Sequence, residues 1–357
     1  MSDTSGTDHM NHTHHVPPWG PAAASAIGSM PGTDAREAAR TVTGSFEAPE
    51  HLPLLPELPA RGPGADMLGR TAGLLAEMYV HLEPSGWRIS DRPGRDTRRA
   101  RAWLGEDLDA IEEFTQGLGG EDRPRGLKVS AVGPWTLAAG LERRNGEAML
   151  GDHGAVRDLA ASLAEGLAAH LAGVRRRVPG AVPVLQLDEP SLTAVLSGSV
   201  RTASGYRTHP AVDRAVVEST LRELLAVHDG PTVVHVCAPG VPVRLLRRAG
   251  ADGVSLDVSL LTEGEDEAIG EVVEDGMTLF AGVVPATEGD GPALSDPAGS
   301  VMGVRSLWRR LGLSPGLLAE SVVVTPTCGL AGAAPAYARR ALAHCARAAR
   351  SLADNPQ

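Results

Sequence analysis

The chain has 357 residues, a net charge of −11 and 42% hydrophobic residues, of which only a few are aromatic. The acidic balance, with no block of basic residues, argues against nucleic-acid binding. No apolar run reaches the roughly 18 residues that a membrane-spanning helix needs. Three cysteines and no secretory signal pattern favour a reducing compartment, and we expect the protein to be cytoplasmic.

The first 20 residues differ in character from the rest. They are polar, lack periodicity and contain four histidines, His9, His12, His14 and His15. This composition predicts a disordered histidine-containing tail over residues 1–20. Residues 24–352 contain no linker, and residues 21–357 are predicted to form a single domain of the length expected for a barrel.

Apolar runs typical of strands alternate with amphipathic helical patterns along the chain. Strands are predicted at residues 24–30, 52–58, 127–132, 182–187, 232–236, 253–256, 277–284 and 321–325. Helices are predicted at residues 66–79, 96–116, 156–178, 213–228, 241–249 and 334–352. This alternation indicates an α/β protein with parallel strands, and eight strands favour a (β/α)8 TIM barrel. The irregular segments 198–205 and 287–299 are interpreted as loops at its mouth.

His235 and Cys237 lie two residues apart at the end of a predicted strand, so their side chains project on the same face. Cys328 follows another strand, and the carboxyl ends of barrel strands meet at one mouth. One imidazole and two thiols are good zinc ligands, and Asp257 at a third strand end would complete a tetrahedral shell. A buried histidine beside a core cysteine is the alternative for the pair alone, but Cys328 favours the metal. Cys345 lies in a helical pattern and is interpreted as a packing residue.

Two further strand ends carry polar residues. Asp188 and Glu189 follow the strand at 182–187, where a carboxylate would hold a substrate ammonium group through a charge-assisted hydrogen bond. A helix-capping role is equally compatible with this motif. Ser29 follows Gly28, which would let a small polar ligand approach closely, although a simple turn is the preferred interpretation of these two residues alone.

Five short motifs together resemble one family, in matching order over residues 24–345. They are Ile27-Gly28-Ser29-Met30-Pro31, Gly133-Pro134, Gln186-Leu187-Asp188-Glu189-Pro190, His235-Val236-Cys237 and Thr327-Cys328-Gly329. The combination resembles the C-terminal catalytic barrel of cobalamin-independent methionine synthase.

The resemblance implies a Zn2+-dependent methyl transfer to the sulfur of homocysteine. The family's zinc ligands fall on His235, Cys237 and Cys328, and its fourth ligand, a glutamate, falls near Asp257. Its homocysteine contacts fall on Ser29 and Asp188. The metal would bind homocysteine as a thiolate, which then attacks an activated methyl group.

Two departures from the family leave the methyl donor open. The family's Asp-x-His-Ser segment is replaced by Val284-Pro285-Ala286-Thr287, which lacks the histidine that assists proton delivery to a folate. The chain also shows no counterpart of the N-terminal barrel that helps to bind the folate. The donor is therefore a folate or a methylated corrinoid carrier. Alternatives are a corrinoid-linked methyltransferase with a different thiol acceptor and a non-catalytic zinc-binding barrel; Asp188 favours an amino acid acceptor.

Overall fold

The computed structural model describes residues 16–119, 125–289 and 294–356. The first fifteen residues of the predicted tail, and residues 290–293 of the predicted loop 287–299, therefore lie outside the described residues. The strands are β1 (Tyr79–Glu83), β2 (Gly86–Ser90), β3 (Arg125–Val132), β4 (Leu141–Glu142), β5 (Ala181–Asp188), β6 (Thr232–His235), β7 (Gly253–Asp257), β8 (Thr278–Val284) and β9 (Val322–Pro326).

The α-helices are α1 (Ala35–Ser45), α2 (Met67–Ala72), α3 (Arg95–Phe114), α4 (Pro134–Gly140), α5 (His153–Arg177), α6 (Leu192–Ser197), α7 (Arg214–Leu225), α8 (Val243–Arg248), α9 (Asp266–Glu274), α10 (Pro297–Ser300), α11 (Met302–Leu311), α12 (Gly316–Ser321) and α13 (Pro335–Asp354). Short 3-10 turns are η1 (Pro59–Arg61), η2 (Met149–Gly151), η3 (Val258–Leu260) and η4 (Glu263–Glu265).

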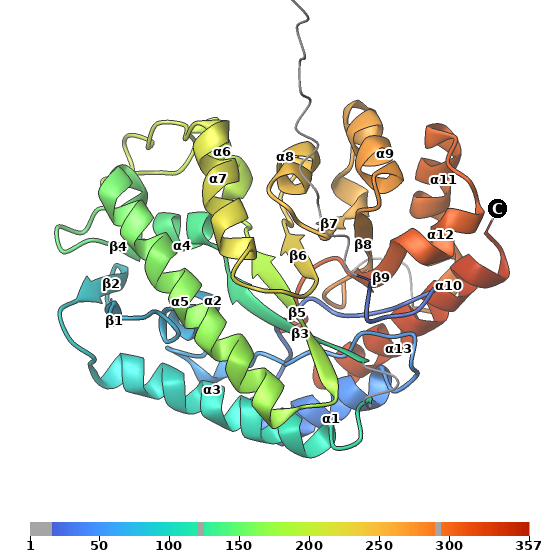
Figure 1. Ribbon diagram of the computed structural model, residues 1–357, viewed down its shortest axis with the longest axis horizontal. Helices are drawn as coiled ribbons and strands as arrows, with labels where there is room; N and C mark the ends of the chain where they lie inside the picture. Colours follow the sequence, from blue (N-terminus) through green and yellow to red (C-terminus); the bar gives the residue numbers. More distant parts are fainter. Residues whose placement is uncertain (1–15, 120–124, 290–293, 357) are drawn as a thin grey trace, which may run out of the picture.

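The main sheet is a curled arc of parallel strands. Among the described residues it has the order β3-β5-β6-β7-β8-β9, so each strand pairs with the next one along the arc (Figure 1). Every residue of β6 and β9 is buried, as expected for parallel strands that are covered on both faces. In the register of the first strands, Asp188 at the end of β5 lies opposite His235 at the end of β6.

Two irregular extended segments complete the ring between β9 and β3. The amide of Ser25 donates to the Val324 carbonyl of β9 at 3.0 Å, and the amide of Leu52 donates to the Ala24 carbonyl at 3.0 Å. The amide of Leu55 then donates to the Lys128 carbonyl of β3 at 2.8 Å. The predicted strands 24–30 and 52–58 therefore occupy their expected places, and the predicted barrel class is confirmed.

These two segments form isolated bridges rather than continuous ladders, unlike the strands that were predicted there. Pro53 and Pro56 lie within the second segment and have no N–H to donate, which interrupts a regular hydrogen-bond ladder. The closing part of the barrel is therefore extended but irregular.

A hairpin outside the ring corrects the prediction of a helix over residues 66–79. The helix α2 ends at Ala72, and β1 and β2 pair antiparallel, with Tyr79 opposite Ser90. Gly86, the first residue of β2 after the turn, has φ +150, a conformation open mainly to glycine. The alternating pattern of β1 and this turn favour a hairpin over a continued helix.

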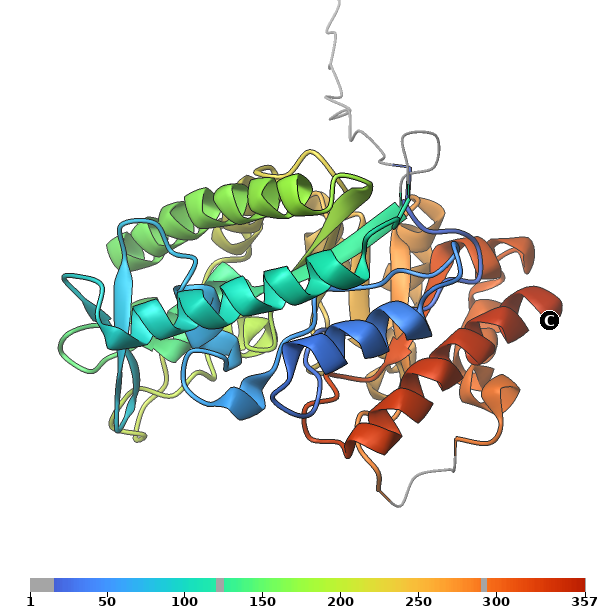
Figure 2. The same ribbon diagram turned by 90° about the horizontal axis from the view of Figure 1, so that it is seen from below.

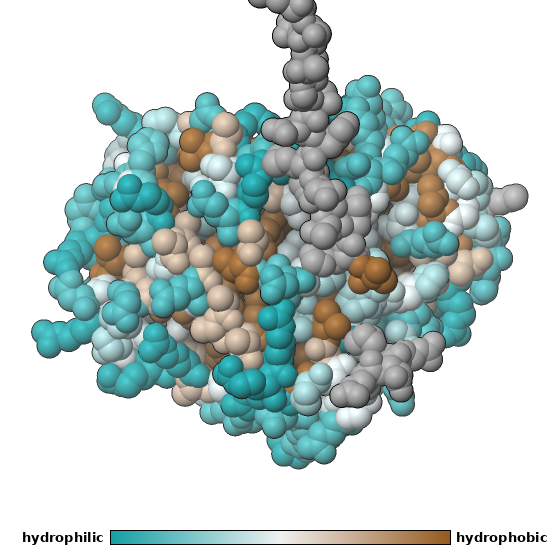
Figure 3. All heavy atoms as spheres, in the orientation of Figure 1, coloured by the Kyte–Doolittle hydropathy of each residue, from teal (hydrophilic) through white to brown (hydrophobic). Residues whose placement is uncertain are grey.

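Helices cover the outside of the ring. Helices α1, α3 and α13 lie next to one another on one side (Figure 2), and α1 contacts both α3 and α13. Polar residues occupy most of the face in Figure 3, with apolar residues gathered nearer its centre. Among the helices of the described residues, none has the length and apolar character needed to span a membrane.

Candidate metal and substrate site

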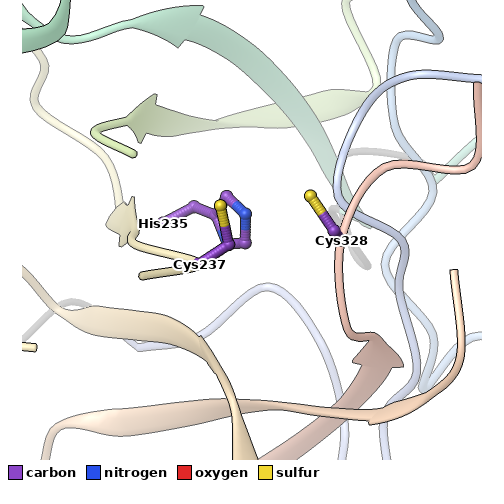
Figure 4. A group of neighbouring side chains, drawn as sticks. All are labelled: His235, Cys237 and Cys328. Carbon is purple, nitrogen blue, oxygen red and sulfur yellow. The ribbon is translucent and has the colours of Figure 1, made fainter. Parts of the chain in front are cut away.

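One imidazole and two thiols meet at the mouth of the ring. His235 ends β6, Cys237 follows two residues later, and Cys328 lies two residues beyond the end of β9. The ligand atoms of these three residues all lie within 4.8 Å of one another. Figure 4 shows Cys328 projecting from its own segment toward the other two side chains. The structure therefore brings together three of the four predicted metal ligands.

The His235 imidazole is oriented by its neighbour on the next strand. It is buried, and its Nδ1 lies 2.9 Å from the Ser255 hydroxyl of β7. Its Nε2 is also buried and has no hydrogen-bond partner within the described part of the chain. Buried ring nitrogens are normally satisfied, and a metal-binding histidine typically has its second nitrogen held by such a partner. The orphaned Nε2 therefore fits a metal ligand.

The two thiols are electrostatically unequal. A hydrogen bond from the Cys237 thiol, and after it the proximity of the His235 imidazole, lower the pKa of Cys328 to about 4. The same contact with Cys328, together with burial, raises the pKa of Cys237. The pair thus holds one thiolate readily, and a bound cation would favour the second. A nitrogen and two sulfur donors suit zinc, so the residues fit the predicted cofactor.

The structure does not bring Asp257 to this cluster. Its carboxylate caps η3, accepting hydrogen bonds from the Ser259 amide at 2.8 Å and the Ser259 hydroxyl at 2.6 Å. It lines a neighbouring cavity of about 760 Å³ between the ends of β7 and β8, which Thr327 also lines. Coordination by Asp257 would require its carboxylate to leave Ser259, and this role stays a prediction.

Asp188 lies at the end of β5, beside β6. Its side chain is buried, and its Oδ1 accepts a hydrogen bond from the Gln186 amide nitrogen at 2.7 Å. Burial raises the pKa of Asp188, while His235 opposes the shift and the Cys328 thiolate adds to it. A buried carboxylate beside the metal cluster would be favoured by a cationic partner such as a substrate ammonium group.

Glu189 has a different role from its neighbour. Its carboxylate accepts hydrogen bonds from the amides of Trp135 and Thr136 at 2.9 and 2.8 Å, and from the Thr136 hydroxyl at 2.7 Å. A Cβ at Gly133 would lie 2.3 Å from Glu189 Oε1, so only glycine lets the two segments meet. Glu189 is thus held at the start of α4, as the capping alternative expected, and the structure shows it engaged by protein donors.

Ser29 lies against the segment that carries Cys328. Its carbonyl accepts a hydrogen bond from the Leu330 amide at 2.8 Å. A Cβ at Gly329 would lie only 2.1 Å from the Ser29 hydroxyl. The predicted substrate contact at Ser29 therefore lies next to the metal cluster in space, although the two are far apart in sequence.

Sequence reasoning missed a set of buried charged and polar residues behind these groups. Glu57 is buried 3.5 Å from the Arg70 guanidinium, and burial raises the pKa of Glu57 to about 7. Lys128 and Gln186 are fully buried in β3 and β5. A usable signal was present: Lys128 is the chain's only lysine, and it lies within an apolar strand.

The fold and the site together define a class of protein, a (β/α)8 barrel enzyme with an imidazole and two thiols arranged for a metal at the mouth. Comparison with known protein families then identifies the family to which the chain belongs. Residues 22–351 match the family described as "Cobalamin-independent synthase, Catalytic domain". The chain belongs to this family and is a methyltransferase of the methionine synthase type, as predicted.

One solved structure shows the same fold. A B12-independent methionine synthase from Shewanella sp. W3-18-1, solved with selenomethionine, is 11% identical with a TM-score of 0.54, covering 94% of this chain and 98% of that one. A phosphodiesterase from Oleispira antarctica, solved with sn-glycerol-3-phosphate, is 11% identical with a TM-score of 0.28, covering 75% and 88%. The second likeness is too weak to carry an argument. No curated protein matches the chain.

Proposed function

We propose that this protein is a zinc-dependent S-methyltransferase that forms methionine from homocysteine. The observation that carries the proposal is the convergence of the unpartnered His235 Nε2 with the sulfur atoms of Cys237 and Cys328. Because both thiols must stay reduced to act as ligands, we also propose that it works in the cytoplasm.

The chain's residues would divide the work between the metal and the amino acid. His235, Cys237 and Cys328 would hold zinc, which when bound supplies positive charge that keeps the substrate sulfur as a thiolate. Asp188 would pair with the ammonium group, and Ser29 would help to orient the rest of the amino acid. Fixed orientation is valuable because correct placement of two reactants can lower a barrier by roughly 7–11 kcal/mol in favourable cases.

The choice of acceptor rests on Asp188. An ammonium group offers this buried carboxylate a cationic partner, whereas a thiol without an amino group would leave it uncompensated. The selenomethionine complex of the Shewanella protein supports an amino acid of this size. The donor would be a folate or a methylated corrinoid carrier, and Asp257 would be a fourth metal ligand that the substrate displaces.

The test is methionine formation by the zinc-loaded protein, followed by mass spectrometry. Homocysteine and coenzyme M would be offered as competing acceptors, with methylcobalamin or methyltetrahydrofolate as donor, in the parent and in Asp188→Asn. We expect homocysteine to be preferred in the parent and that preference to fall in the variant. Faster methylation of coenzyme M by the parent would instead support the different-acceptor alternative. Zinc binding without turnover with any of these reactants would support a non-catalytic barrel.

A further inference from the structure

Lys128 lies at the centre of a buried network that joins two parts of the proposed homocysteine site. Its Nζ donates to the Ile27 carbonyl at 2.6 Å and to the side-chain oxygen of Gln186. The Gln186 amide nitrogen in turn donates to the same Ile27 carbonyl at 3.0 Å and to Asp188 Oδ1 at 2.7 Å. Lys128 thus reaches Asp188 through one side chain, and it reaches the residues before Ser29 directly.

Lys128 and Asp188 hold opposite ends of the Gln186 amide. An ammonium group is a donor only, so the Gln186 oxygen must face Lys128 and its nitrogen must face Asp188. Without the ammonium group, the Gln186 oxygen would lose this buried partner, and the side chain that donates to Asp188 would no longer be held at its other end. The orientation of the Asp188 carboxylate therefore depends on a lysine that does not touch it.

The hydrogen bond from Lys128 to the Ile27 carbonyl concerns the position of Ser29, the other proposed contact for homocysteine. The segment at 24–30 has only isolated bridges to its neighbours, so a continuous ladder does not fix its backbone. The Ile27 carbonyl is held instead by side chains from β3 and β5, including the Ser130 hydroxyl at 3.2 Å. Ser29 follows two residues later, so these side chains set where its hydroxyl lies.

Lys128 is buried, and burying a charged side chain is unfavourable unless neighbouring groups compensate its charge. Lys128 is fully buried, and burial lowers the pKa of its ammonium group to about 7, while Asp188 and Glu57 oppose that shift. Removing one member of a buried charged network leaves its partners uncompensated and lowers stability. The positioning role of Lys128 is therefore tested by a binding preference, which a loss of stability alone does not change.

We propose that Lys128 is a positioning residue for the amino-acid end of homocysteine, acting on Asp188 through Gln186 and on Ser29 through the Ile27 carbonyl. This role rests on the proposed function. It predicts that loss of the Lys128 ammonium group affects recognition of the amino acid and leaves recognition of the thiol unchanged.

The test compares two thiols by calorimetric titration of the zinc-loaded full chain. Homocysteine carries the amino and carboxylate groups, and 1-propanethiol has the same carbon chain to sulfur without them. We expect Lys128→Met to raise the Kd for homocysteine about tenfold or more and the Kd for 1-propanethiol less than about twofold. The matched control is Ser25→Ala, which removes a different side-chain contact to the same irregular segment, from its hydroxyl to the Leu52 carbonyl at 2.8 Å, and should leave both constants unchanged.

A second variant keeps the test decisive if Lys128→Met fails to fold. Gln186→Glu retains an acceptor for Lys128 but loses the donor to Asp188. It should therefore also weaken the binding of homocysteine and leave the binding of 1-propanethiol unchanged. Equal penalties for both thiols, or no penalty for homocysteine, would overturn the positioning role alone. A zinc-loaded parent that binds no homocysteine would overturn the proposed function and this inference together.

Discussion

The two parts of the barrel are held in place by different means. In the arc from β3 to β9, hydrogen-bond ladders between backbones fix each strand end, and the metal cluster lies on this arc. In the closing segments at 24–30 and 52–58, isolated bridges are supplemented by buried side chains such as Ser25 and Lys128. The proposed metal ligands thus depend on backbone geometry, whereas Ser29 depends on the side chains that hold the nearby Ile27 carbonyl. Substitutions on the arc and substitutions in the closing segments should therefore have different effects.

The largest effect is expected on the arc, from Cys328→Ala. This change removes one of three clustered ligands while leaving the backbone ladder of β9 intact. We expect bound zinc to fall from about one per chain to nearly none and methyl transfer to be abolished, with an unchanged circular dichroism spectrum. Cys345→Ala is the control because its thiol is buried in α13, away from the cluster. Normal methyl transfer by Cys328→Ala would refute the metal assignment.

In the closing segments, Glu57→Gln should change how stability depends on pH. Burial raises the pKa of Glu57 from 4.5 to about 7, so the stability that this group contributes is present below pH 4.5 and is lost as the pH rises through 7. Glutamine cannot titrate, so the stability of the parent relative to the variant should fall by up to about 3 kcal/mol between pH 4.5 and 8. Urea unfolding across this range measures the difference. A constant difference would show that Glu57 does not titrate there.

A smaller effect is expected when one side-chain contact of the closing segments is removed. The Ser25 hydroxyl donates to the Leu52 carbonyl at 2.8 Å, and Ser25→Ala should lower the free energy of unfolding by about 1 kcal/mol. Thr325→Val on β9 is the matched comparison, since its buried hydroxyl has no hydrogen-bond partner in the described residues. It should cost less than Ser25→Ala. Equal costs would remove the proposed distinction between the two parts.

The smallest effect is expected where the two parts meet. A Cβ at Gly329 would lie 2.1 Å from the Ser29 hydroxyl, so Gly329→Ala should displace that hydroxyl. Homocysteine should bind about threefold more weakly, equivalent to about 0.7 kcal/mol, while zinc content stays constant. Gly332→Ala is the control in the same loop, where a Cβ finds nothing closer than 3.5 Å. Unchanged homocysteine affinity in Gly329→Ala would argue against Ser29 as a contact.

Sequence patterns predicted the arc better than the closing segments. The apolar runs of β6 and β9 are continuous and buried, and the ligands at their ends follow from the two-residue period of a strand. The irregular backbone at 24–30 and 52–58 arises from tertiary contacts and from prolines, which a periodicity argument does not weigh. The helices α1 and α9 and the β1–β2 hairpin were not predicted.

The residues of the site could likewise be predicted only in part. The convergence of His235, Cys237 and Cys328 could be predicted because few residue types bind zinc and all three lie at or just beyond strand ends. Lys128 and Gln186 could not be assigned, since their partners are a carbonyl and a carboxylate that only the closed barrel brings near. The capping role of Glu189 depends on α4, a short helix that no amphipathic pattern indicated.

The most direct test of the central claim is the zinc content of the full chain by elemental analysis, compared with that of Cys237→Ser. Both proteins carry the same four histidines near the N-terminus, so the difference between them reports the barrel site alone. The account predicts about one more zinc per chain in the parent than in the variant. Equal zinc in the two proteins after reconstitution would contradict a metal centre at His235, Cys237 and Cys328.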